Sequence, residues 1–270
     1  MSINFVIRGR LGNAIYRYMA SAILCINTNK EYSSGHNNGY NPNPNIHLSD
    51  DNFLEISQYL SENKSINLDS KNVMMSGFYQ HDSIYKMFRT EIFNYINSNK
   101  NHLIITDGVN AGDGNNETFK MYDILNTPTN FNKKYNIVLH LRLEDFVTHN
   151  LYLPVDRIIT LLNKIIITDN ISDNICIVCK KTSTDFEENY IKSILHFLNE
   201  KNIDIIIENN DVITDYYIMK EAEILVCSKS TLSWAAAFLS DKNKVCYFPD
   251  YTITGSNQTC KSPTTNTILY

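Results

Sequence analysis

Two short stretches of this chain hold the side chains best suited to chemistry, and both suit a phosphorylated ligand. The first, IVLHLRLEDF, spans residues 137–146 and alternates as a strand does, with His140 and Arg142 on one face. Arg142 therefore falls at the carboxyl end of the expected strand, where ligands of open α/β sheets bind. A guanidinium there can donate two parallel hydrogen bonds to a diphosphate, which a lysine cannot do.

The second stretch, DYYIMKEAEILVCSKSTLSWAAAFL, spans residues 215–239. It predicts a short helix, followed by a buried strand, a polar turn and a second helix over 224–227, 228–231 and 232–239. A strand, a Ser/Thr turn and a helix in that order point backbone N–H groups and the positive end of the helix dipole at one spot, which suits a phosphate. Ser230 and Thr231 can either cap the helix or donate hydrogen bonds to an anion, and capping is the more common role.

The N-terminus predicts a third strand, turn and helix, over 3–7, 8–13 and 14–26. Rossmann-like units use this arrangement to bring backbone close to a ligand, although Gly9 and Gly12 do not make the dinucleotide fingerprint G-x-G-x-x-G. The turn is either a tight connection in which Asn13 caps the helix or one wall of a ligand cleft.

Together the three stretches resemble the signatures of the α-1,2-fucosyltransferases, glycosyltransferase family 11, and more distantly those of the protein O- and α-1,6-fucosyltransferases. Those enzymes have an N-terminal G-x-(L/F)-G-N loop, an H-x-R-(R)-x-D segment and a terminal segment that ends in (N)-S-(T/S)-x-S-W. The matching text here is GRLGN, HLRLED and KSTLSW, in the same order along the chain. The resemblance covers these stretches directly, and the text between them is compatible with it.

This resemblance implies an inverting, metal-independent transfer of L-fucose from GDP-fucose to a glycan hydroxyl, with an α-1,2 linkage and no cofactor. It also implies a GT-B-like α/β fold, in which two Rossmann-like domains face a cleft and a parallel sheet in the C-terminal half holds the donor. The expected partners are a nucleotide sugar and a glycan acceptor.

The resemblance makes Arg142 the catalytic arginine on the diphosphate, where a fixed positive charge stabilises the negative charge that grows on the β-phosphate. The other implied residues bind the donor: Gly12 and Asn13 line the cleft, His140 lies near the guanine or ribose, Asp215 takes the guanine N1–H and amino group, and Ser230 and Thr231 bind phosphate. Simpler roles stay open for two of them, a hydrogen-bonded histidine on a half-buried strand for His140 and a helix N-cap for Asp215.

The chain departs from these signatures at several positions. Leu143 replaces the second arginine, Glu144 replaces the glycine that follows it, and Lys229 replaces the asparagine before Ser-Thr. Leu143 fits the buried face of the strand, and Lys229 either restores the missing positive charge or is simply solvated. Two alternatives therefore stay open: an enzyme of the same fold that uses another nucleotide sugar, and an inactive module that only binds one.

The residues do not single out a base that deprotonates the acceptor hydroxyl. Glu144, Asp145 and Asp113 are conceivable, and so is a phosphate of the substrate. Asp145 is better placed to orient the Arg142 loop than to touch substrate.

The elements that position these residues follow from the apolar pattern. The polar text NTPTNFNKK at 126–134 indicates a linker, so we expect an N-terminal acceptor-side domain over 1–134 and a C-terminal nucleotide-sugar domain over 135–270. Beyond the linker, strands alternate with helices, which predicts a parallel sheet. The expected strands cover 137–141, 175–179, 203–207, 224–227 and 244–248, the expected helices include 155–167 and 185–199, and the tail 249–270 is expected to be coil.

In the N-terminal half, polar text predicts loops at 32–50 and 107–117. Apolar text between them predicts helices at 51–62 and 82–97 and strands at 73–78 and 102–106.

Composition narrows the class of protein. The 270 residues carry a net charge of −5 without a basic run, which argues against nucleic acid or an anionic membrane as partner. The six cysteines lie mostly in apolar text, as buried thiols of a reducing compartment do, and the C-I-V-C pair at 176–179 has no second pair to make a metal site. No signal peptide or membrane-spanning stretch is evident, so we expect a cytoplasmic protein.

Overall fold

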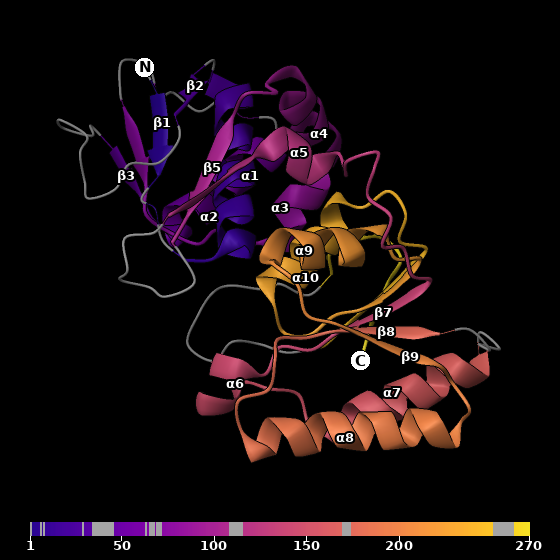
Figure 1. Ribbon diagram of the computed structural model, residues 1–270. Coiled ribbons are helices and arrows are strands. Elements are labelled where there is room, and N and C mark those ends of the chain that lie inside the picture. Colours follow the sequence, from indigo (N-terminus) through magenta and orange to yellow (C-terminus); the bar gives the residue numbers. More distant parts are fainter. Residues whose placement is uncertain are drawn as a thin grey trace. The chain divides into compact units, whose positions relative to one another are not determined.

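The computed structural model describes residues 2–5, 7, 9–28, 30–33, 46–62, 64, 68, 72–107, 116–168, 174–250 and 262–270. The chain forms two compact units, here called unit 1 and unit 2, which take in the described residues up to Phe131 and from Asn132 onward. The expected domain boundary at 134/135 falls in the same stretch, 126–136, which contains neither helix nor strand. Both units contain parallel strands and helices (Figure 1).

Unit 2 contains the parallel sheet that the alternating pattern predicts. Its strands are β7 (Ile137–His140), β8 (Ile175–Val178), β9 (Ile205–Glu208), β10 (Ile224–Val226), β11 (Val245–Phe248) and β12 (Thr267–Leu269). They pair in the order β12-β11-β10-β7-β8-β9, and every pairing is parallel. The chain enters the sheet at the central strand β7 and adds β8 and β9 on one side. It then adds β10, β11 and β12 on the other side of β7. This reversal between β7 and β10 is the topological switch point where open α/β sheets bind ligands.

Helices cover both faces of this sheet, which explains why its inner strands are apolar except for His140 at the end of β7. They are α6 (Glu144–Thr148), α7 (Val155–Thr168), α8 (Asp185–Glu200), α9 (Val212–Glu221) and α10 (Thr231–Leu239). Figure 1 shows α7 and α8 on one face and α9 and α10 on the other. All residues of β7 and β8 are buried.

The alternation along β7 decides which side chains reach the α7–α8 face. Leu139, Leu141 and Leu143 are buried in one core with residues of α7 and α8. Leu143 is only 7% exposed and therefore belongs to the core rather than to the edge of the sheet. The predicted burial of Leu143 is confirmed. Arg142 is therefore the arginine of the segment 141–146 that follows β7.

Unit 1 is built on a smaller parallel sheet. Its strands β1 (Ser2–Phe5), β2 (Glu31–Tyr32), β3 (Ile46–Leu48) and β4 (Val73–Met75) pair in the order β2-β1-β4-β3. A separate antiparallel pair joins β5 (Leu103–Thr106) to β6 (Glu117–Lys120). The helices are α1 (Leu11–Thr28), α2 (Asp50–Ser61), α3 (Asp82–Met87), α4 (Arg89–Ser98) and α5 (Met121–Leu125). The carboxyl ends of β1 and β4, which are adjacent strands, lie at one edge of this sheet.

The structure corrects the sequence-based expectations at four places. The tail is not all coil, because β12 pairs with β11; two of its three residues, Ile268 and Leu269, are 41% and 44% exposed, so it lacks the buried pattern that marks a strand. The expected loop at 32–50 contains β3. The expected helix at 82–97 is two helices that meet at Phe88, whose φ of −101° and ψ of 18° interrupt the helical path. Finally, α1 begins at Leu11, so Asn13 lies inside its first turn and does not cap it.

The cysteines of the described residues are buried thiols, as expected. Cys25, Cys176, Cys179, Cys227 and Cys246 are buried and free, while Cys260 lies outside the described residues. The Sγ atoms of Cys227 and Cys246, on β10's carboxyl end and on β11, are 3.6 Å apart. Within the described part of the chain no helix combines the length and apolar character that crossing a bilayer requires.

Candidate functional site

A hydrogen bond joins the two sides of the switch point in unit 2. His140 is the last residue of β7, and Ser228 follows β10 by two positions. The Ser228 Oγ and the His140 Nδ1 are 2.9 Å apart, and both residues are buried. Segments 88 positions apart in the sequence are therefore held side by side at the carboxyl edge of the sheet.

His140 is neutral at ordinary pH. Burial, together with the positive charge of Arg142, lowers its pKa from 6.5 to about 3. A neutral imidazole has one N–H and one lone pair, so His140 contributes hydrogen-bonding capacity to the site and no charge. The simpler role that the sequence left open, a hydrogen-bonded buried histidine, is what the structure shows at Nδ1.

The polar turn after β10 is fixed by its own hydroxyls. Ser230 is the N-cap of α10, and its Oγ accepts a hydrogen bond of 3.2 Å from the Leu232 N–H. The Ser233 hydroxyl is 3.4 Å from the Ser228 carbonyl and 3.1 Å from the Ser230 carbonyl, to which it can donate. Thr231 opens α10 and is partly exposed. Capping is thus the observed role of Ser230, whose hydroxyl hydrogen remains able to bind an anion.

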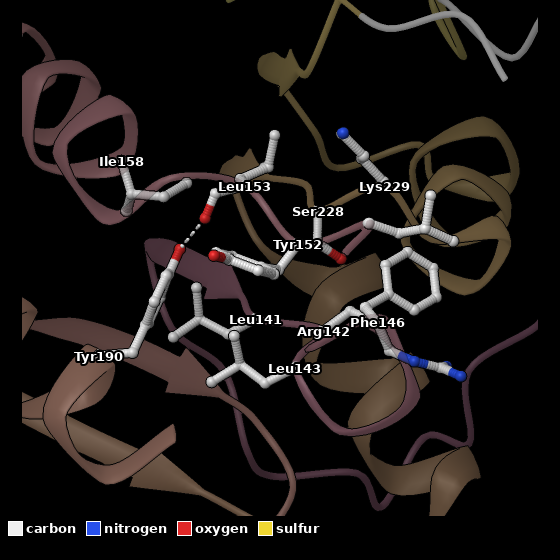
Figure 2. Close-up of a pocket in the computed structure, with 11 residues that line it drawn as sticks. Leu141, Arg142, Leu143, Phe146, Tyr152, Leu153, Ile158, Tyr190, Ser228 and Lys229 are labelled. Atoms are coloured by element: carbon white, nitrogen blue, oxygen red, sulfur yellow. Dashed lines mark hydrogen bonds between the residues drawn. The ribbon is translucent and has the colours of Figure 1, made fainter. Parts of the chain in front are cut away.

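Arg142 is held by an internal carboxylate. Its Nε and Nη2 donate to Asp145 Oδ1 at 3.0 and 2.9 Å, and Nη2 donates to Asp145 Oδ2 at 2.9 Å. Its guanidinium lies 5.1 Å from the centre of the Phe146 ring, and Nε is 3.8 Å from Glu144 Oε2. In Figure 2 the guanidinium points away from the Ser228 hydroxyl. The Arg142 guanidinium, which is expected to bind a diphosphate, donates instead to both carboxylate oxygens of Asp145. These bonds agree with the orienting role expected for Asp145.

A pocket opens beside these residues (Figure 2). Its empty volume is about 240 Å³, part of which is open solvent. Its polar lining comes from Arg142, Ser228 and Lys229, and its apolar lining from Leu141, Leu143, Phe146, Leu151, Tyr152, Leu153, Ile158 and Tyr190. Pockets that enclose a drug-sized ligand measure roughly 300–1,000 Å³. This hollow is smaller and partly open, so it does not by itself enclose a nucleotide sugar.

Asp215 belongs to a second polar cluster of unit 2. Its Oδ1 accepts hydrogen bonds from the Asn210 N–H and the Asn210 side-chain amide at 3.2 and 3.1 Å, and the Lys180 Nζ is 3.8 Å from its Oδ2. Burial raises the pKa of Asp215. The N-cap of α9 is Asp211, so the simpler capping role is wrong for Asp215.

This second cluster lies at the carboxyl ends of β8 and β9, since Lys180 and Asn210 each follow one of those strands by two residues. It extends from Asn210 to Glu208, which also accepts hydrogen bonds from the Lys133 Nζ at 2.8 Å and the Tyr135 hydroxyl at 2.5 Å. These partners hold the pKa of Glu208 below its usual value against the effect of burial.

Gly12 and Asn13 lie in unit 1, in the first turn of α1. The Asn13 Oδ1 accepts a hydrogen bond of 3.2 Å from the Gln80 side-chain amide, which connects the first turn of α1 to the segment between β4 and α3. The Gly9 N–H donates to Asp107 Oδ2 at 2.6 Å, and the Asp107 N–H donates to the Gly9 carbonyl at 3.1 Å. This edge of unit 1 therefore combines the Asn13 and Gln80 amides and the Asp107 carboxylate with Arg10, which directly precedes α1.

Sequence reasoning missed the side chains that complete these sites. Ser228 and Asn210 are not prominent in the sequence, and their partners depend on which strands are neighbours. Of the conceivable bases, Glu144 and Asp145 both face Arg142, and Asp113 lies outside the described residues. Among the described residues no group of three or more His, Cys, Asp or Glu side chains is arranged to hold a metal ion.

Comparison with known proteins adds no relative. No protein-family model matches this sequence, and no curated protein is significantly similar to it. A functional conclusion therefore depends on the geometry of the two sheet edges and on the resemblance of the three short stretches.

Proposed function

We propose that this chain is an inverting, metal-independent glycosyltransferase that moves L-fucose from GDP-fucose to a glycan hydroxyl in α-1,2 linkage. The observation that supports it best is the Ser228–His140 hydrogen bond at the switch point of a parallel Rossmann-type sheet. Arg142 and the N-cap of α10 flank that point. The identity of the sugar and the linkage are supported only by the resemblance of the three stretches.

In this proposal the diphosphate binds at the carboxyl edge between β7 and β10. Negative charge grows on the β-phosphate as the sugar leaves, and Arg142, the hydroxyls of Ser230 and Thr231 and the N-terminus of α10 stabilise it. Arg142 first exchanges Asp145 for the phosphate, and because both partners are bidentate oxygen acceptors the exchange conserves its hydrogen bonds. No cofactor takes part, since the protein itself supplies the positive charge.

The remaining expectations complete the proposal. Asp215 recognises the guanine edge, after Asn210 gives up the carboxylate oxygen it now occupies. Unit 1 contributes the acceptor side of a GT-B-like arrangement, with Gly12 and Asn13 at its ligand-facing turn. The free, buried cysteines of the described residues suit a reducing compartment such as the cytoplasm.

The deciding experiment is product analysis after incubation with GDP-fucose and a glycan array. We expect a fucosylated product from the natural protein, about 10²- to 10³-fold slower turnover by Arg142→Ala, and unchanged product from Lys192→Ala. Lys192 is a suitable control because it is an exposed lysine of α8 that pairs with Glu188. Full turnover by a folded Arg142→Ala protein contradicts the proposal.

A second candidate is a nucleotide-sugar-binding module without activity, and two observations favour it. Leu143 is buried where the signature has a second arginine, and Asp145 already neutralises Arg142. Saturable GDP binding without release of sugar to any acceptor would select this candidate. A third, a transferase of another nucleotide sugar, is separated by thermal-shift screening of donors, since a ligand at a hundred times its Kd stabilises the folded state by about 2.7 kcal/mol.

A further inference from the structure

Strand β12 of unit 2 leads directly to a side chain that contacts the turn of the candidate site. Tyr270 follows β12, and its N–H donates to the Phe248 carbonyl at 3.1 Å, so it continues the pairing with β11. Its hydroxyl donates to the Cys227 carbonyl at 2.6 Å, 43 positions earlier in the sequence. Cys227 lies between the end of β10 and Ser228. The tail of the chain therefore supplies a hydrogen-bond partner at the start of the polar turn.

The Tyr270 ring is held in place by contacts outside the turn. It packs against the core of unit 2, and the Arg157 guanidinium lies 5.6 Å from its centre. Arg157 Nη2 also donates to the main-chain oxygen of Tyr270, and the Asp250 N–H donates to the same oxygen at 2.8 Å. Burial raises the pKa of Tyr270, so the hydroxyl stays protonated and remains a donor. The hydroxyl is thus presented to the Cys227 carbonyl by a fixed ring.

The Cys227 carbonyl is the point at which this bond affects the site. The Cys227 N–H donates to the Tyr247 carbonyl at 2.8 Å, so one side of this residue still belongs to the sheet. Its carbonyl forms a peptide group with the N–H of Ser228, whose Oγ is 2.9 Å from the His140 Nδ1. Because a peptide group is planar, the direction of the Cys227 carbonyl fixes the direction of the Ser228 N–H. The Tyr270 hydroxyl therefore orients the first peptide group of the turn.

We propose that Tyr270 is a positioning residue of this site, which acts through the Cys227 carbonyl on the turn 228–231. The inference deepens the proposed function and rests on it, since the diphosphate binds at this turn in that function. Tyr270 itself does not touch the donor. By fixing the first peptide group, it keeps the hydroxyls and the N–H groups at the start of α10 in the arrangement that an anion needs. A turn that is ordered beforehand loses less conformational freedom when the ligand binds.

The first test needs no ligand. Tyr270→Phe removes only the hydroxyl, because the aromatic ring remains. We expect the nitrogen resonance of His140 Nδ1 to shift in this variant, and the amide protons of the turn 228–231 to exchange about tenfold faster, the effect of one lost hydrogen bond. Tyr32→Phe is the matched control, since it removes a hydroxyl that donates to the Leu103 carbonyl at 2.7 Å in unit 1. It should leave both signals unchanged.

The second test is calorimetric titration of the whole chain with GDP. We expect about three- to tenfold weaker binding by Tyr270→Phe and unchanged binding by Tyr32→Phe. A partly unfolded sample would lower the number of binding sites and leave their affinity unchanged, so the affinity distinguishes positioning from a general loss of structure. If Tyr270→Phe fails to fold, Arg157→Gln, which removes a partner of the ring and of the main-chain oxygen, should change the same signals in the same direction.

The outcomes separate the positioning role from the proposed function. Equal GDP affinity in the natural protein and Tyr270→Phe overturns the positioning role and leaves the function standing. Weaker binding without any change at the turn also overturns it, because Tyr270 would then act by another route. Faster exchange and a shifted His140 resonance in a protein that binds neither GDP nor GDP-fucose support the positioning of the turn and contradict the function. No change at the turn and no binding overturn both.

Discussion

The two units end their central strands in chemically different ways. In unit 1 the turn between β1 and α1 is held by Gly9, Asn13 and their neutral or acidic partners. In unit 2 the turn between β10 and α10 is held by hydroxyls and an imidazole, with Lys229 beside it. Both turns stand at the carboxyl edge of a parallel sheet, so the shared architecture does not decide what each edge can bind.

The comparison indicates that the side chains of the turn, rather than the sheet, determine which class of ligand binds at each edge. Amides both donate and accept hydrogen bonds and suit the hydroxyls of a sugar, whereas cations and N–H groups at a helix start suit a phosphate. Arg10, directly before α1, gives the turn of unit 1 a cation and a helix start as well, so the two turns differ chiefly in the side chains that hold them. Each edge can be altered separately, which gives four tests.

The largest effect should come from removing the guanidinium. Arg142→Ala should lower kcat by about 10²- to 10³-fold, because it deletes a donor to developing charge. Asn13→Ala should lower kcat/KM by only about tenfold, the effect of one neutral hydrogen bond. Steady-state kinetics with GDP-fucose measure both. Equal losses of activity in Arg142→Ala and Asn13→Ala would contradict the prediction that the guanidinium contributes more than the amide.

The second test compares how the two turns are held. Gly9 has a φ of +79°, and a Cβ there would lie 2.7 Å from the Asn13 Nδ2. Gly9→Ala should therefore reduce the free energy of unfolding by about 2 kcal/mol or more. Ser230→Ala, which removes only a cap, should cost about 1 kcal/mol. Urea titrations measure both, and an Ala at position 9 that costs less than the lost cap contradicts the prediction.

The third test uses pH. Unfolded His140 binds a proton below about pH 6.5, while the folded pKa is about 3, so stability is present above this window and is lost as pH falls through it. His140 alone should contribute a slope of up to about 1.4 kcal/mol per pH unit between pH 6 and 4. His140→Gln should remove that slope in urea titrations.

The buried His81 of unit 1 is the comparison. Burial lowers its pKa as well, but Asp50 nearby opposes the shift, whereas Arg142 reinforces it at His140. His81→Gln should flatten the pH profile less than His140→Gln does. The reverse order would show that the neighbouring charges do not distinguish the two histidines.

The smallest effect concerns Glu144. Its φ of +30° is in the region that favours glycine, which the resembling signature has at this position. Glu144→Gly should raise the free energy of unfolding by about 0.5–1 kcal/mol, since relief of strain exceeds the added freedom of the unfolded chain. Glu144→Ala removes the same charge and keeps the strain. A gain that is equal in both variants would assign the effect to charge.

The sequence predicted most of unit 2 because its central strands are buried on both faces. The apolar runs of β7, β8 and β10 are unmistakable, and the alternation in β7 predicted the burial of Leu143. The exposed edge strand β12 has no such pattern and was missed. Short-range partners such as Asp145 for Arg142 can be anticipated from spacing, whereas the Ser228–His140 bond depends on β7 and β10 being neighbours.

The buried thiols make this chain suitable for site-directed labelling. Burial raises the pKa of Cys25, Cys176, Cys179 and Cys227, so almost none of these thiols is ionised near neutrality and maleimides should react with them slowly. With Cys260 replaced by serine, a cysteine introduced on the outer face of α8 and another on α2 can carry a fluorophore pair. Energy transfer between the two dyes would then report on the distance between the units in solution, with and without a nucleotide sugar.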